Sequence, residues 1–404
     1  MVILEAIVSG VTYIVMALFM GALATGSFVL PSGQNPLRRA LLSAAFFLLS
    51  AFLLVAVFSL AVQGAKLSDG NPPTLEILAR YLSRTQSGRI WLIREIYGSL
   101  LLLLLFRLQG SAKSERVCGW GFFLSLPLVA SRSLMSHAAA VKEDMFLAVS
   151  ADAIHIIATA LWAGGLPVLL WTLWRGTKSF GLPLSWAAQA VACFSRLALF
   201  SVAVLVLTGF YQSWIHVQSW SALFGSSYGK VLLVKLALFV SMAALGALNF
   251  FSTKPALVNA AVDAPIRNTA LRRIGAEGVI GLMIFSLTGL LTVLPPGAHS
   301  QHQSFASSAK TFQPAEGAAV QILSPKNGEI VAGDQVPIRF KLVPGKSGHH
   351  VHAYVDGELM GMFESRNGTL TGIRPGRHTL ELRVAADDHQ TELDASDKVQ
   401  FVVK

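Results

Sequence analysis

The sequence predicts a mainly α-helical protein, an eight-helix transmembrane bundle followed by a small all-β sandwich domain. Of its 404 residues, 53% are hydrophobic and only 13% are charged, whereas soluble domains carry about 25% charged residues. Apolar runs of the length that crosses a bilayer recur through residues 1–296. Residues 318–404 instead show the short alternating runs that are typical of β-strands.

The predicted order of elements follows from these patterns. Spans are expected at residues 3–30, 41–63, 90–108, 118–136, 147–174, 191–216, 229–251 and 271–294. Residues 297–317 are rich in Ser and Gln and lack a hydrophobic period, which predicts a flexible linker. Seven strands are expected in the sandwich, at residues 320–323, 335–342, 350–355, 358–363, 369–373, 378–385 and 398–403. Asp356-Gly357 lies between two alternating runs, which indicates a tight hairpin.

Two recurring matches suggest that the bundle is a duplicated four-helix unit, a parallel 4+4 repeat. An offset of 141 residues carries Gly88 onto Gly229, and an offset of 143 carries Gly21 onto Gly164. An even number of spans in each unit relates the two units by an axis along the membrane normal.

The net charge of +10 is concentrated in short loops between the predicted spans. In this position Lys and Arg set the orientation in the membrane, and no nucleic-acid partner is expected. The richer set of loops should face the cytoplasm, which places both termini outside it. We expect a multi-pass protein of the bacterial inner membrane, in contact with lipid.

Three ionisable residues surround one predicted turn on the outer side. His137 ends one span, while Asp152 and His155 lie one helical turn apart in the next. Ionisable groups inside a membrane are costly and mark functional sites by default. Imidazole binds Cu, Zn, Fe and Ni, and a carboxylate beside it acts as a ligand or orients the ring. The alternative is an Asp–His pair that is only satisfied within the bundle.

Further polar residues in the spans are expected to be structural. They stabilise the bundle or contact lipid headgroups, and they comprise Arg94, Lys235, Asn249, Arg273 and Glu277. Arg273 and Glu277 are four residues apart on one helix and could pair with each other.

Three histidines near the membrane exit are relay positions for a metal ion. His216 ends the sixth span, and His299 and His302 lie in the linker. The alternative for each is an ordinary interfacial or solvated side chain.

The sandwich carries a second set of metal-ligand types. His350 and His352 share one strand face, as do Met360 and Met362 on the next strand. Thioethers select Cu(I), and imidazole accepts copper in either oxidation state. A sandwich with no metal, in which these are plain strand residues, is equally compatible with the sequence.

Two other functions remain open. A membrane redox protein would hold one b-type haem between two histidines on facing helices. A membrane anchor would only present a protein-binding sandwich. No nucleophile elbow, phosphate loop or pair of catalytic carboxylates is found, so we expect no enzyme.

Residues 137–296 resemble the membrane domain of the copper resistance protein D (CopD) family. The matching residues are Ser136-His137-Ala138, Asp152, His155, Trp162, Gly164-Gly165, Phe194-Ser195-Arg196, Thr208-Gly209, Trp214, Tyr228-Gly229-Lys230, Lys235, Asn249, Arg273, Glu277 and Pro295-Pro296. The resemblance implies an inner-membrane protein that moves copper, as Cu(I) or Cu(II), inward across the bilayer. It also implies a periplasmic copper-binding partner, with His137 and His155 as copper ligands.

Overall fold

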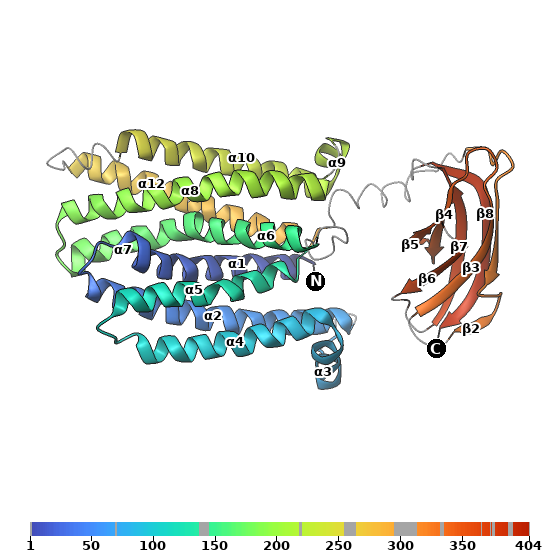
Figure 1. Ribbon diagram of the computed structural model, residues 1–404, viewed down its shortest axis with the longest axis horizontal. Coiled ribbons are helices and arrows are strands. Elements are labelled where there is room, and N and C mark those ends of the chain that lie inside the picture. The colour runs from blue at the N-terminus through green and yellow to red at the C-terminus, as the bar shows by residue number, and fades with distance from the viewer. Residues whose placement is uncertain are drawn as a thin grey trace. The chain divides into compact units, whose positions relative to one another are not determined.

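The protein divides into two compact units, which are considered separately. The computed structural model describes residues 2–68, 71–136, 145–217, 220–253, 264–294, 313–331, 335–364, 366–371, 373, 376–386 and 391–403. The first unit, Met1–Gly297, is helical, and the second, Ala298–Lys404, is built of β-strands (Figure 1).

Helices occupy all eight positions that the sequence predicts for spans. Their bounds are α1 (Val2–Ala24) with the π-helical turn η1 (Thr25–Val29), α2 (Asn35–Leu67), α3 (Leu75–Arg84), α4 (Gln86–Leu108), α5 (Ser114–Ser133), α6 (Met145–Thr159), η3 (Ala160–Gly164), α7 (Gly165–Ser179), α8 (Leu184–Val217), α9 (Trp220–Gly225), α10 (Ser227–Leu248), η4 (Asn249–Thr253) and α12 (Ala264–Leu291). In the described part of the chain, 6 helical stretches are long and apolar enough to cross a membrane. Helices α4 and α5 are not among them, and α4 contains Arg94, Glu95 and Arg107. The number of eight spans therefore stays a prediction.

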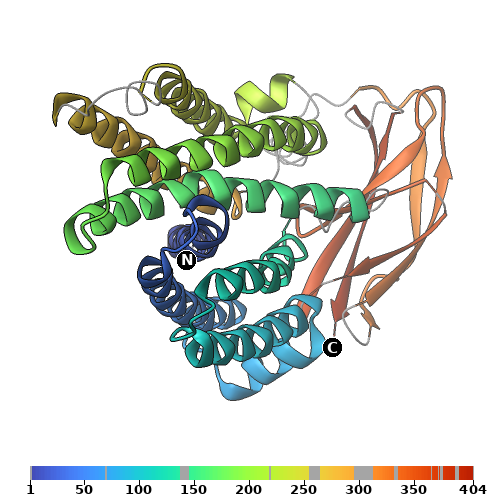
Figure 2. The same cartoon turned by 60° about the vertical axis from the view of Figure 1, so that its left-hand side comes forward.

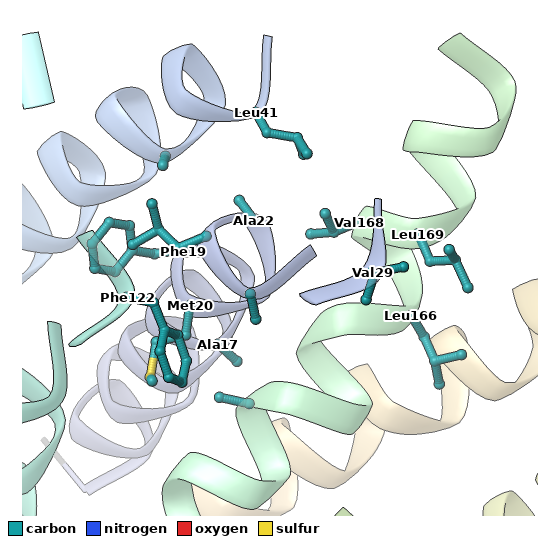
Figure 3. Close-up of a cluster of buried hydrophobic side chains, with 14 of the residues drawn as sticks. Ala17, Phe19, Met20, Ala22, Val29, Leu41, Phe122, Leu166, Val168 and Leu169 are labelled. Carbon is teal, nitrogen blue, oxygen red and sulfur yellow. The ribbon is translucent and has the colours of Figure 1, made fainter. Parts of the chain in front are cut away.

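Helix α1 forms the centre of the helical unit. In both views it lies between α5 on one side and α6 on the other (Figures 1 and 2). It packs against α2, α5, α7, α12 and the turn η3. Its buried Phe19 and Met20 face Phe122 of α5, while Leu166 and Leu169 extend this core along α7 (Figure 3). Contact of α1 with both halves of the chain explains why its sequence is apolar on all sides.

Two glycines allow α1 to touch η3 through its backbone. A Cβ atom on Gly21 would lie 2.8 Å from the carbonyl oxygen of Gly164, and one on Gly164 would lie 2.4 Å from that of Ala17. Small residues permit such close approach of helices in membranes. Gly21 and Gly164 are also the pair that the predicted repeat makes equivalent, and equivalent residues meet when they lie on a symmetry axis.

Helices α4 and α10 begin with the same capping arrangement. The hydroxyl of Thr85 accepts a hydrogen bond from the backbone N–H of Gly88, and the hydroxyl of Ser226 accepts one from Gly229, each at 2.9 Å. Ser and Thr are favoured at this position because they satisfy an amide that has no partner inside the helix. Thr85 and Ser226 are also 141 residues apart, which favours the 4+4 repeat.

The second unit is a sandwich of two sheets, as the sequence predicts. Its strands are β1 (Ala319–Ser324), β2 (Glu329–Val331), β3 (Gln335–Val343), β4 (His350–Val355), β5 (Glu358–Phe363), β6 (Asn367–Thr371), β7 (Gly376–Ala385) and β8 (Glu392–Val403). The sheets have the orders β1-β3-β6 and β2-β8-β7-β4-β5. Apolar side chains from both sheets, among them Phe340, Leu382 and Phe401, form one buried core.

A strand lies at each of the seven expected positions, but β6 and β7 begin two residues earlier than expected and β8 begins six residues earlier. Strand β2 was not expected, and it pairs in parallel with β8 over three residue pairs. A run this short has no readable alternation, so its pairing depends on the distant β8. The Asp356-Gly357 hairpin is confirmed, with φ angles of 51° and 87° that give it the left-handed backbone of a tight turn.

We expect Gly164→Ala to destabilise the helical unit. The added methyl group would overlap the carbonyl oxygen of Ala17, and overpacking costs about 1–3 kcal/mol, which exceeds the helix-propensity gain of about 1 kcal/mol. Gly275→Ala in α12 is the matched control, since no atom lies within 4 Å of its added Cβ. Thermal unfolding in detergent, followed by size-exclusion chromatography, should show a lower midpoint for Gly164→Ala alone. Equal midpoints would contradict the close contact of α1 with η3.

Candidate functional site

Helices α6, α8 and α10 enclose a polar cluster at one end of the second half of the bundle. Asp152 and His155 lie on α6, one turn apart as predicted. Gln212 of α8 donates a hydrogen bond from Nε2 to Asp152 Oδ1 at 3.3 Å. Ser136, which follows α5, donates from Oγ to Asp152 Oδ2 at 3.0 Å. Both oxygens of this carboxylate are therefore bonded by side chains from outside α6.

A threonine on α8 orients the ring of His155. The hydroxyl of Thr208 donates to the carbonyl oxygen of Val204 at 2.7 Å, and His155 Nδ1 lies 2.9 Å from the same hydroxyl oxygen. When the hydroxyl proton is given to Val204, Nδ1 is the donor in this contact. The neutral ring then carries its lone pair on Nε2, and Nε2 has no hydrogen-bond partner among the described residues. An imidazole held in this tautomer is prepared to bind a metal ion through Nε2.

A positive charge lies beside this pair. Lys235 of α10 is close enough to Asp152 and to His155 for their charges to interact. The phenol of Tyr228, on the same helix, also senses the charge of Asp152. In an apolar bundle an ammonium and a carboxylate stabilise each other strongly, so Lys235 balances the charge of Asp152. The prediction of Lys235 as a purely structural residue misses its proximity to the predicted site.

A second polar pair lies deeper, at the end of α10. Asn249 donates a hydrogen bond from Nδ2 to Oε1 of Glu277, whose side chain is buried. The partner of Glu277 is therefore Asn249 and not Arg273, as the four-residue spacing had suggested. Together with Trp162, both residues line a mainly apolar cavity of about 310 Å³.

The sandwich buries the two histidines that were predicted to bind metal. His350 and His352 point outward from the sheet relative to their core-facing neighbours on β4, yet they are only 0% and 4% exposed. Their Nε2 atoms are 3.1 Å apart. Nδ1 of His352 lies 3.0 Å from Oε1 of Glu392, and this oxygen also accepts a hydrogen bond from the hydroxyl of Tyr354. Burial and the hydrogen bond to Glu392 raise the pKa of Tyr354 above its ordinary value.

The two methionines are less closely involved in this cluster. Met362 is the cross-strand partner of His352, but Met360 and Met362 are 37% and 39% exposed. Copper ligation by His350, His352, Met360 and Met362 together stays a prediction. The carboxylate of Glu392 is a hydrogen-bond partner of His352 that the sequence did not predict.

Several predicted residues fall outside what the structure describes. His137 lies within 137–144, and His299 and His302 lie within 295–312. The backbone of His216 belongs to α8, but its side chain is not described. Within the described residues no group of three or more His, Cys, Asp and Glu side chains is arranged to hold a metal ion. The roles predicted for these four histidines, the haem pair included, remain predictions.

No site role was predicted from the sequence for three residues, although Thr208 is among those that carry the family resemblance. Thr208, Gln212 and Glu392 orient ligand-type side chains that come from other elements. Thr208 and Gln212 do leave a signal, because two polar residues four apart mark one face of the otherwise apolar α8. Glu392 leaves none, since it begins β8 in a stretch rich in acidic residues that was not predicted as strand.

Long apolar helices that enclose ionisable side chains define a multi-pass membrane protein. The family model for copper resistance protein D matches residues 188–291, and the model for the copper resistance protein D-like N-terminal domain matches residues 3–145. Together these stretches make up more than half of the chain. The protein belongs to the copper resistance protein D family, and the resemblance seen in residues 137–296 extends into the first half.

One relative and two solved structures add to this comparison. Over 220 residues the chain is 28% identical to the copper transport protein CutJ of Bacillus subtilis (strain 168), which covers 53% of this chain and 38% of CutJ. The fibronectin(III)-like modules of Clostridium thermocellum CbhA match 21% of this chain and 94% of theirs, with 21% identity and a TM-score of 0.19. Cytochrome c heme lyase CcmF matches 100% of this chain and 87% of its own, with 14% identity and a TM-score of 0.16. Scores this low do not establish a common fold.

Proposed function

We propose that this protein carries copper inward across the bacterial inner membrane and receives the ion at the cluster of Asp152 and His155. Membership of the copper resistance protein D family supports copper as the cargo. CutJ, a relative over part of its length, is described as a copper transport protein. With both termini outside the cytoplasm, as the loop charges predict, the cluster lies on the outer side and a periplasmic copper-binding protein supplies the ion.

The orientation of His155 is the observation that carries this proposal. Its Nδ1 is committed to Thr208, so Nε2 is the ligand atom. His137 supplies the second imidazole in this mechanism, since it follows Ser136, which already bonds Asp152. Asp152 adds a negative charge that favours a cation, and this set of donors is compatible with copper in either oxidation state.

Lys235 gives the site a means to release its cargo. An ammonium next to a copper ion is unfavourable in a medium of low dielectric constant. The ammonium therefore competes with copper for the carboxylate of Asp152, and the site holds copper less tightly than its ligands alone would allow. A transport site requires this property, because binding must be weak enough for the ion to leave.

The sandwich acts as a second, outer copper site in this proposal. His350 and His352 bring two Nε2 atoms together, and Glu392 holds the ring of His352 from the far side. A carboxylate that fixes the ring of a ligating histidine is a common feature of metal sites. The histidine pair would capture copper before it enters the membrane unit.

Copper binding to purified protein tests the membrane site. We expect His155→Ala to remove one equivalent of copper. Thr208→Val should weaken binding by about 10–100-fold, the usual effect of losing the group that orients a ligand. Thr288→Val in α12 is the matched control, because its hydroxyl makes the same bond to its own helix and touches no histidine. Equal copper content in all four proteins would remove the proposal, and a Soret band would favour the haem alternative.

Replacing Lys235 by Met should have the opposite effect. An ammonium and a copper ion in a medium of low dielectric constant repel each other, so removing the ammonium should tighten copper binding by about tenfold or more. Lys230→Met, an exposed lysine on the same helix, serves as control. Competition with a chelator of known affinity measures both dissociation constants. Weaker or unchanged binding in Lys235→Met would contradict the competition between ammonium and copper.

The outer site can be tested in a chain that carries His155→Ala. In that background we expect one remaining equivalent of copper, and its affinity should fall by about 10–100-fold in Glu392→Gln. Glu364→Gln, at an exposed position in the same unit, should bind as the parent does. If His350→Ala and His352→Ala leave copper binding unchanged, the sandwich has no copper site at this pair.

A further inference from the structure

A polar cavity lies in the first half of the bundle. It has a volume of about 250 Å³ and is lined by residues of α1, α2, α3, α4, α5 and by Thr292. Most of its polar lining can donate hydrogen bonds; these residues are Ser9, Ser59, Gln63, Tyr81, Ser87, Trp91, Arg94 and Arg132. It differs from the apolar cavity beside Glu277 in this respect.

Two guanidinium groups dominate this cavity. Arg94 of α4 is only 3% exposed, and Arg132 of α5 is close enough for the two positive charges to repel each other. Arg94 has one carboxylate neighbour, Glu95, with 3.4 Å between Nε and Oε1. Glu5, the acidic residue of the lining, is already bonded to Gln63 at 2.9 Å and to Lys66 at 3.1 Å. Positive charge is therefore in excess.

The hydrogen-bonding capacity of the cavity is also in excess. The Nε atom of Arg132 is buried and has no hydrogen-bond partner. The side-chain hydroxyls of Ser9, Ser59 and Ser87 donate no hydrogen bond within the described part of the chain. Buried polar atoms without a protein partner are few in folded proteins, and a water molecule or an ion beside them is a common explanation. Among the described residues Nη1 of Arg38 and Nε of Arg175 are also such atoms, but Nε of Arg132 is the one that belongs to the lining of this cavity.

The cavity occupies the position that the 4+4 repeat makes equivalent to the copper cluster. On α4 and α10, the offset of 141 residues carries Arg94 onto Lys235. On α1 and α6, the offset of 143 carries Ser9 onto Asp152. Ser59 and Gln63 on α2 are spaced as Thr208 and Gln212 are on α8, with an offset of 149. Four residues that line this cavity thus correspond in sequence to four residues of the copper cluster.

The two sites differ in their charged side chains. The first half keeps the cation of the pair, Arg94, and adds Arg132. It replaces the carboxylate of Asp152 by the hydroxyl of Ser9, and the position of His155 is taken by Thr12. A site with these changes no longer favours a metal ion. Two guanidinium forks with hydroxyl donors match the oxygens of a phosphate group.

We infer that this cavity binds a phosphate group, supplied either by the headgroup of a phospholipid or by inorganic phosphate. The guanidinium groups of Arg94 and Arg132 hold its oxygens, and hydroxyls of the lining complete the contacts. A bound anion would offset the repulsion between the two arginines and satisfy Nε of Arg132. Neither histidine of the proposed copper ligands lines this cavity.

Two measurements on the full chain test the inference and separate the sources. Native mass spectrometry after purification in detergent should show one retained phospholipid on the wild type, and the retained fraction should fall at least tenfold in Arg132→Gln and in Arg94→Gln. Arg107→Gln, at an exposed position on α4, should retain lipid as the wild type does. For inorganic phosphate, titration of delipidated protein should give a saturable change in tryptophan fluorescence that Trp91→Phe reduces.

Each outcome decides the matter. Retained lipid that depends on both arginines identifies a headgroup site, and a saturable phosphate signal that depends on them identifies a site for the free anion. If the wild type retains no lipid and shows no saturable response to phosphate, the inference is overturned, whatever the stability of the variants. Arg132→Lys, which keeps the charge but not the fork, should bind more weakly than the wild type.

Discussion

The requirement that polar groups inside an apolar bundle find partners within the protein governs this structure. A carboxylate such as Asp152 cannot rely on water at membrane depth, so it is bonded by Ser136 and Gln212 and balanced by Lys235. Gln212 and Lys235 lie on α8 and α10, and Ser136 lies just after the end of α5. The cluster therefore joins α5, α6, α8 and α10, and the arrangement of these helices in turn fixes the direction in which His155 presents its lone pair.

This requirement also explains what the sequence could predict. Asp152 and His155 were recognisable because ionisable residues are conspicuous in an apolar run, and their shared face follows from helical periodicity. Their partners were not, because Thr208 and Gln212 are common in membrane helices and their role depends on how α8 packs against α6. Likewise, the spacing of Arg273 and Glu277 suggested a pair, but packing of α12 against η4 gives Glu277 a different partner, Asn249.

In the sandwich the sequence predicted more of the fold than of the site. Alternation and the Asp356-Gly357 turn were enough to place most strands and one hairpin. The pairing of β2 with β8 and the contact of Glu392 with His352 join residues far apart in the chain. Contacts of this kind depend on strand order, which neither composition nor periodicity reveals. The same limit applies to Met360 and Met362, whose alternation is correct but whose exposure was not foreseeable.

The residues just after α5 connect the arginine-rich cavity with the cluster of Asp152. Met135 lines the arginine-rich cavity, while its neighbour Ser136 holds Asp152. A single planar peptide unit connects these residues and does not stretch. A displacement of Met135 by a ligand in the arginine-rich cavity would therefore also displace Ser136 and its hydrogen bond to Asp152. The cavity in the first half of the bundle and the cluster in the second half are thus mechanically coupled.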